Sequence, residues 1–206
     1  AQLSRGLGDV YKRQVGINGF GRIGRLVLRA ILENYKSKIQ VVAINDLGSI
    51  ETNAHLIKYD STHGTINEDI QTSSDGFKIS NQNIKVFGER DPANIPWGKV
   101  GADVVLECTG IFLDKKSSEK HIKAGAKKVI ISAPGKEVDF TIVQGVNSKD
   151  LKKEHNIISN GSCTTNCLAP VAMVLEKNFG INYGYMTTIH SYTCLLYTSP
   201  SPRDSC

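Results

Sequence analysis

The stretch VGINGFGRIG, residues 15–24, decides the fold of this 206-residue chain. It begins with a short, mostly apolar run, and its three glycines, Gly19, Gly21 and Gly24, fit the pattern G-x-G-x-x-G. Apolar residues then recur at the helical period over residues 22–34. In such a strand–turn–helix unit the glycines permit a tight turn, close approach of a pyrophosphate, and close packing of helix on strand. The pattern predicts a dinucleotide-binding site; the alternative is a glycine-rich turn without a ligand.

An acidic residue follows the next apolar run. Residues 40–45, QVVAIN, read as a parallel strand buried on both faces, and Asp46 comes directly after them. A carboxylate about 20 residues beyond the glycines can accept hydrogen bonds from the ribose hydroxyls of a dinucleotide. The same carboxylate would repel the 2′-phosphate of NADP, and residues 47–49 contain no base. We therefore expect NAD; the alternative is an ordinary surface aspartate.

Strand and helix patterns alternate along the rest of the chain. Predicted strands cover residues 15–18, 40–45, 77–80, 84–87, 103–107, 128–132, 140–143 and 157–158, and predicted helices cover 22–34, 51–59, 117–124 and 168–178. Residues 81–83 favour a hairpin between two of these strands. Repeated strand–helix–strand units predict an α/β fold with a doubly wound, Rossmann-type parallel sheet.

The domain organisation is predicted from changes in composition. We expect residues 15–161 to form the dinucleotide-binding domain and residues 162–193 to begin an α+β catalytic domain that is incomplete. Residues 1–14 and 194–206 show no periodicity and are interpreted as a non-native leader and tail. Native termini without regular structure are the alternative.

A candidate nucleophile lies at the predicted start of the last helix. Small polar residues at 160–166 come before the apolar run of that helix and mark its N-terminus, which places Cys163 in the first turn. The positive end of the helix dipole favours a thiolate there. We interpret Cys108, which we place in a strand, and Cys167 as inert packed residues. These residues alone leave open whether Cys163 is catalytic or buried filler.

A candidate base follows the same helix. His190 ends a strand-like segment, residues 185–190, and successive elements can bring a nucleophile and its base together. His55 and His121 fall in predicted helices and are interpreted as surface or packing residues.

Composition excludes several classes of protein. No apolar run approaches the roughly 18 residues of a membrane span, and the five cysteines have neither metal-ligand spacing nor the density of a disulfide scaffold. The net charge of +5 shows no basic cluster, which argues against a nucleic-acid surface. We expect a cytoplasmic protein that binds no metal, membrane or nucleic acid.

Nine segments, in order, carry a resemblance to a known family. They read VGINGFGRIGRLVLRA, VVAIND, KYDSTHG, GERDP, ECTG, KKVIISAP, VQGVN, IISNGSCTTNCLAP and MTTIHSYT. Over residues 15–193 the chain resembles phosphorylating glyceraldehyde-3-phosphate dehydrogenase, and SCTTNC is highly specific to that family. Erythrose-4-phosphate dehydrogenase shares these signatures and stays an alternative, as does a non-catalytic NAD-binding module.

The resemblance implies a role for each matching residue. Cys163 would be the nucleophile and His190 its base. Arg22, Ile23, Asp46, Arg90 and Ser132, with Gly19, Gly21 and Gly24, would contact NAD. Ser162, Cys163, Thr164 and Thr193 would hold the substrate or inorganic phosphate.

The resemblance also implies an activity and an assembly. It implies the glycolytic oxidation of glyceraldehyde 3-phosphate, with inorganic phosphate, to 1,3-bisphosphoglycerate by a homotetramer. In the family the catalytic domain continues beyond the histidine segment and supplies an arginine for the substrate phosphate and an asparagine for the nicotinamide. We therefore expect the chain as given to be a fragment that is marginally folded and inactive. The sequence leaves open its oligomeric state and the aldehyde it prefers.

Overall fold

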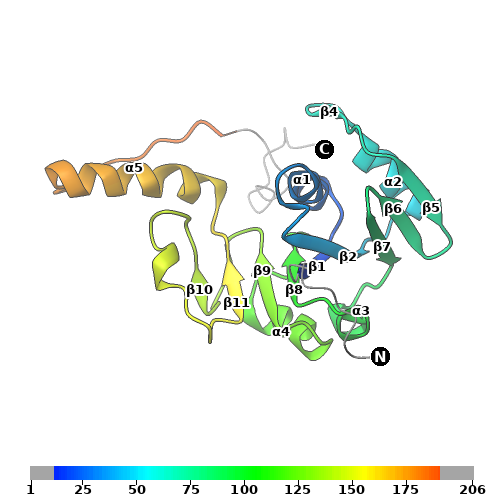
Figure 1. Ribbon diagram of the computed structural model, residues 1–206. Coiled ribbons are helices and arrows are strands. Elements are labelled where there is room, and N and C mark those ends of the chain that lie inside the picture. Colours follow the sequence, from blue (N-terminus) through cyan, green and yellow to red (C-terminus); the bar gives the residue numbers. More distant parts are fainter. Residues whose placement is uncertain (1–11, 191–206) are drawn as a thin grey trace, which may run out of the picture.

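The computed structural model describes residues 12–190, which contain a nine-stranded mixed sheet (Figure 1). Its strand order is β10-β11-β9-β8-β1-β2-β7-β6-β5. The strands are β1 Arg13–Asn18, β2 Ile39–Asn45, β5 Ile70–Ser73, β6 Gly76–Ile79, β7 Gln82–Phe87, β8 Val104–Glu107, β9 Lys128–Ile131, β10 Phe140–Thr141 and β11 Ile157–Ser159. Neighbours from β10 to β7 are parallel, whereas β5, β6 and β7 form an antiparallel meander.

Helices cover both faces of the sheet (Figure 1). They are α1 Arg22–Ala30, extended by a π-helical turn at Ile31–Tyr35, α2 Ile50–Lys58, α3 Trp97–Val100, α4 Lys115–Lys123 and α5 Cys163–Phe179. Short 3-10 turns occur at Pro92–Asn94 and Ser148–Asp150, and β3 Tyr59–Asp60 pairs with β4 Gly64–Thr65. The parallel strands joined by crossing helices confirm the predicted α/β, Rossmann-type class.

The apolar core lies in two layers because the parallel strands bury both faces. On one face Leu28 of α1 and Ile57 of α2 pack with Ile17 of β1, and all three side chains are fully buried. On the other face Trp97 of α3, also fully buried, packs against Ala43 of β2 and the residues around it. These layers fix the carboxyl ends of the central strands at one edge of the sheet.

The first strand begins earlier than predicted. Arg13 and Gln14, which we assigned to a leader, lie in β1 and pair with Ile39 and Gln40 of β2. Polar side chains at an exposed strand end carry no periodic signal, so this boundary was missed. Residues 1–11 of the predicted leader and all of the tail, 194–206, lie outside the described residues.

Several short elements were not predicted. The meander strand β5 is mostly exposed and polar, α3 spans only four residues, and β3 and β4 have two residues each, so none has room for a period. The predicted hairpin is present, but β7 begins at Gln82 and leaves only Ser80 and Asn81 in the turn.

The last described region differs from the rest. Helix α5 follows β11 and extends away from the sheet (Figure 1), and none of its residues is buried. The strand predicted over residues 185–190 is wrong: this segment has no strand hydrogen bonds, because no described strand lies beside it. The predicted division of the chain at residue 162 coincides with this change, and it stays a prediction.

Candidate active site

The glycine-rich turn has the geometry that its spacing predicts. Gly19 has φ of +86°, a conformation that side chains disfavour, and a Cβ on Gly24 would lie 2.2 Å from the carbonyl oxygen of Gly19. A Cβ on Gly21 would meet nothing within 4 Å. The first glycine therefore makes the turn, the third permits close packing, and the second leaves open space beside the start of α1.

A cleft of about 380 Å³ lies beside this turn, at the carboxyl ends of β1, β2 and β8. It is lined by Asn18, Gly19, Gly21, Asn45, Asp46, Leu47, Glu89, Arg90, Cys108, Thr109, Ile111 and Phe112. In open α/β sheets a ligand binds where the strand order reverses, outside the carboxyl ends of the strands. β1 lies between β8 and β2, so the cleft occupies that position.

Asp46 connects two turns that border the cleft. Its Oδ2 accepts a hydrogen bond from the backbone N–H of Phe20 at 2.9 Å, and its Oδ1 accepts one from Gly48 at 2.8 Å. Both carboxylate oxygens are therefore oriented by the backbone. Each oxygen keeps a second lone pair that can accept a ribose hydroxyl.

Of the other predicted cofactor residues, some line the cleft and others lie outside its lining. Arg90 lines the cleft, whereas Arg22 and Ile23 lie in the first turn of α1 outside its lining, with Ile23 half exposed. Arg22 is paired with Asp60, Nη1 to Oδ2 at 3.1 Å. Ser132 follows β9, and its backbone N–H donates to the carbonyl of Glu107.

Cys163 is the first residue of α5, so it lies in the first turn as predicted, although the helix begins five residues before the predicted range 168–178. The hydroxyl of Ser162 caps this helix by accepting a hydrogen bond from the N–H of Thr165 at 2.9 Å. The cap leaves the positive end of the helix dipole at Cys163. Cys163 Sγ lies 2.9 Å from Nε2 of His190, so the structure brings together the two residues that we paired from the sequence.

The contact with His190 lowers the pKa of the Cys163 thiol, and hydrogen bonds from Thr164 lower it further. Cys108 has the opposite environment: burial raises the pKa of its thiol to about 12. Cys108 also lies just beyond β8 rather than within the predicted strand. Cys167 was expected to be packed but is exposed, because nothing described covers that face of α5.

The remaining predicted substrate residues surround this cysteine. Ser162 and Thr164 flank it directly, whereas Thr193 lies outside the described residues. Between residues 12 and 190 no group of three or more His, Cys, Asp or Glu side chains could hold a metal ion. In the same part of the chain no helix is both long and apolar enough to cross a bilayer.

Sequence reasoning missed several residues of the cleft. Asn18 and Asn45, the last residues of β1 and β2, line it together with Thr109 and Ile111 beyond β8. Polar residues at the ends of adjacent parallel strands were the available signal, because such ends meet at one edge of the sheet.

Together, the sheet order, the glycine turn and the cleft define a dinucleotide-binding domain followed by the start of a second domain. Residues 13–115 match the family model described as glyceraldehyde 3-phosphate dehydrogenase, NAD binding domain, and residues 162–199 match the model of its C-terminal domain. The chain belongs to the glyceraldehyde-3-phosphate dehydrogenase family. Its cofactor is NAD, as the sequence predicts.

Bacterial relatives agree with this assignment. The chain is 55% identical over 181 residues to glyceraldehyde-3-phosphate dehydrogenase 2 of Streptomyces avermitilis, a match that covers 87% of this chain and 54% of the relative. The enzymes of Zymomonas mobilis and Pseudomonas aeruginosa are 55% and 52% identical with the same coverage. The chain spans about half the length of the curated relatives it matches.

The residues of the cleft fit an NAD molecule. The space beside Gly21 is open at the N-terminal end of α1, where free N–H groups and the helix dipole favour phosphate. Asp46 stands at the end of β2 with lone pairs for a ribose. NAD would therefore be held by the glycine turn at its pyrophosphate and by Asp46 at its adenosine ribose.

Proposed function

We propose that this chain carries the NAD site and the nucleophile of a phosphorylating glyceraldehyde-3-phosphate dehydrogenase, which oxidises glyceraldehyde 3-phosphate to 1,3-bisphosphoglycerate. The observation that carries the proposal is the 2.9 Å contact between Cys163 Sγ and His190 Nε2 at a helix N-terminus. An imidazole within hydrogen-bond distance activates a thiol as a nucleophile. Family membership supports the choice of aldehyde.

In the proposed reaction His190 Nε2 takes the thiol proton, and Cys163 Sγ forms a C–S bond to the aldehyde carbon. His190 gives the proton to the resulting alkoxide, and takes it back as the carbonyl of the thioester forms. NAD⁺, when bound, supplies the acceptor for the hydride that leaves this carbon. A phosphate oxygen then attacks the thioester, the C–S bond breaks, and an acyl phosphate leaves with the Cys163 thiolate restored.

The neighbouring hydroxyls support this assignment of the substrate side. Ser162 and Thr164 stand on either side of the nucleophile, and Thr164 hydrogen-bonds to it. We propose that they orient the aldehyde or inorganic phosphate, together with Thr193. The homotetramer stays a prediction.

Protection from alkylation tests the proposal on the chain as given. Glyceraldehyde 3-phosphate is added before a brief, substoichiometric pulse of iodoacetamide, and each cysteine is mapped by mass spectrometry. We expect the aldehyde to slow labelling of Cys163 and to leave Cys167 unchanged. Cys167 is a matched control, because it is exposed one turn further along the same helix. Equal labelling of Cys163 with and without the aldehyde would contradict the proposal.

A further inference from the structure

Beneath the cofactor cleft lies a fully buried carboxylate that the proposed reaction does not use. Glu107, the last residue of β8, has no exposed surface and does not line the cleft. Its strand partner at the end of β1 is Asn18, which in turn pairs with Asn45 at the end of β2. The strand ends thus place a row of polar side chains across the floor of the cleft.

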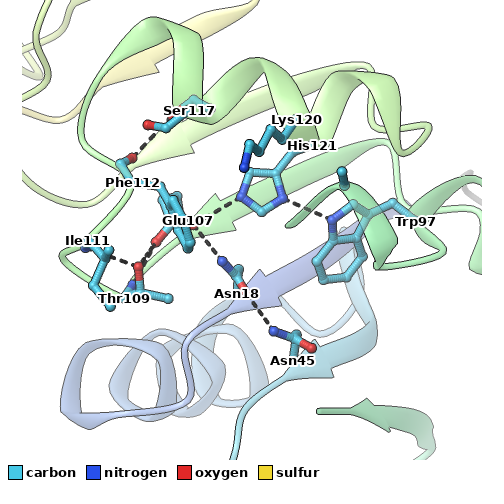
Figure 2. Close-up of polar contacts among 12 residues, drawn as sticks. Asn18, Asn45, Trp97, Glu107, Thr109, Ile111, Phe112, Ser117, Lys120 and His121 are labelled. Atoms are coloured by element: carbon cyan, nitrogen blue, oxygen red, sulfur yellow. Dashed lines mark hydrogen bonds and ion pairs between the residues drawn. The ribbon is translucent and has the colours of Figure 1, made fainter. Parts of the chain in front are cut away.

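Within residues 12–190, each polar group that contacts the Glu107 carboxylate can act as a hydrogen-bond donor (Figure 2). Its Oε1 accepts from the N–H of Thr109 at 2.8 Å and contacts the Thr109 hydroxyl closely. Its Oε2 lies 2.6 Å from Nδ2 of Asn18 and 3.0 Å from Nε2 of His121, which comes from α4. An ionised carboxylate, which accepts at both oxygens and donates at neither, satisfies all four contacts.

The direction of the histidine contact is fixed from the far side of the sheet. The indole N–H of Trp97 can only donate, and it lies 3.0 Å from Nδ1 of His121 (Figure 2). His121 Nδ1 must therefore accept, so its proton is on Nε2 and points at Glu107. This assigns a neutral imidazole that donates to Glu107.

The direction of the amide contact is fixed from the opposite side. The backbone N–H of Glu89 donates to Oδ1 of Asn45 at 2.8 Å, which turns Nδ2 of Asn45 towards Oδ1 of Asn18, also at 2.8 Å. Asn18 therefore presents its own Nδ2 to Glu107. The N–H of Ile111 donates to the Thr109 hydroxyl, which leaves the hydroxyl proton free to be donated to the carboxylate.

We infer that Glu107 is a positioning residue of the NAD site: as a buried anion it orients the cleft-lining residues Asn18, Asn45 and Thr109, and through Asn45 the turn at Glu89. The inference rests on the NAD site and adds a residue that acts on NAD only through its neighbours. A buried acceptor with four donors is costly to replace, because each orphaned donor loses its partner. Glutamine at this position would set its amide group against at least one of these N–H donors.

Two variants separate this role from simple packing. Glu107→Gln keeps the shape of the side chain but introduces a donor, whereas Glu107→Asp keeps the acceptor charge and is shorter. We expect Glu107→Gln to weaken NAD⁺ binding, measured by calorimetry, about tenfold or more and Glu107→Asp to weaken it less. Glu154→Gln, the same change at an exposed position, should leave binding unchanged. Weaker NAD⁺ binding by Glu107→Asp than by Glu107→Gln would show a packing role and contradict the inference.

Nuclear magnetic resonance provides readouts that need no cofactor. In Glu107→Gln the amide protons of Thr109 and Glu89 should exchange faster than in the wild type and in Glu154→Gln. An unchanged exchange rate of the Glu89 amide proton would contradict the proposed chain of hydrogen bonds through Asn18 and Asn45. In the wild type, His121 should carry its proton on Nε2. A charged His121, or a proton on Nδ1, would overturn the inference even if Glu107→Gln did not fold.

The two proposals fail in different ways. A wild-type chain that does not bind NAD⁺ would contradict the proposed cofactor site, while amide exchange and the His121 tautomer would still decide the role of Glu107. Normal NAD⁺ binding by the wild type and by Glu107→Gln alike would contradict the role of Glu107 alone.

Discussion

The sheet region, up to residue 162, and the α5 region, residues 163–190, build their functional geometry by different means. In the sheet region the cleft residues are fixed by strand register, by two apolar layers and by the buried network around Glu107. In the α5 region no helix residue is buried, and Cys163 contacts His190 directly at the capped start of the helix. Packing therefore organises the cofactor side, whereas local electrostatics organises the nucleophile.

The largest expected contrast is between the cysteines of the two regions. Burial raises the pKa of Cys108 to about 12, whereas the contact with His190 lowers the pKa of Cys163. Because only a thiolate reacts, we expect iodoacetamide to label Cys163 about a thousandfold faster than Cys108 at neutral pH. Peptide mapping after a short pulse measures both rates in one sample. Labelling of Cys108 or Cys167 before Cys163 would show that the nucleophile is wrongly chosen.

A matched pair of leucines tests the difference in packing. Leu28 of α1 is 0% exposed and Leu175 of α5 is 45% exposed. Leu28→Ala should lower the free energy of unfolding by about 2–5 kcal/mol, and Leu175→Ala should change it by about 0.5 kcal/mol or less. Urea denaturation followed by circular dichroism gives both values. Equal losses would mean that α5 is packed in solution.

The effect of the His190 contact on Cys163 is tested by a substitution at His190. A lowered thiol pKa means that more of Cys163 is reactive thiolate at a given pH below its ordinary pKa, and this thiolate is lost as the pH falls through the lowered value. In His190→Asn the pKa of Cys163 should return towards its ordinary value, so the labelling profile should move to higher pH and the rate at pH 7 should fall about tenfold. His155→Asn, a change in the sheet region, is the control. If the pH dependence of Cys163 labelling is the same in His190→Asn as in the wild type, His190 is excluded as the base.

The preset geometry of the cofactor side is tested at Asp46. Asp46→Ala removes the carboxylate that the backbone N–H groups of Phe20 and Gly48 orient. We expect NAD affinity to fall about tenfold and the preference over NADP to narrow, because one change removes both the hydrogen bonds and the repulsion. Calorimetry with both dinucleotides measures this. Asp150→Ala, at an exposed position, should change neither affinity, and an unchanged NAD affinity in Asp46→Ala would exclude Asp46 as the ribose ligand.

The smallest effect is expected on self-association. Val171 and Leu175 contribute to an apolar surface of α5 that is about half exposed. Exposed apolar patches favour association, so Val171→Lys should lower the apparent molecular mass at high protein concentration. Analytical ultracentrifugation measures this change. The control is Thr72→Lys, which places the same charge on the exposed strand β5.

The sequence predicted the elements whose patterns are set locally. The glycine turn at 19–24 and the apolar strand that became β2 were confirmed, because turn geometry and burial on both faces leave a direct mark on residue choice. The strand expected over residues 185–190 was wrong, because an apolar alternation forms a strand only beside a partner. Such a partner is a tertiary fact that no local pattern contains.

The sequence likewise predicted only part of the candidate site. Asp46, Cys163 and His190 follow from motif and position; Asp46 lines the cleft and Cys163 contacts His190, while their roles stay predictions. Glu107 escaped notice because its role depends on residues brought from β1, α3 and α4. His121 was interpreted as a surface or packing residue; it is packed, and its hydrogen bonds to Trp97 and Glu107 could not be read from its helix alone.

The position of Trp97 has a consequence for spectroscopy. It is the single tryptophan of the chain, fully buried on the sheet and hydrogen-bonded to His121. Intrinsic tryptophan fluorescence therefore reports on the sheet region, whereas far-ultraviolet circular dichroism includes the long helix α5. If the two regions unfold separately, the two signals will give different melting curves, which is a direct test of two-state behaviour. The protein thus carries its own probe for deciding whether its two regions are one cooperative unit.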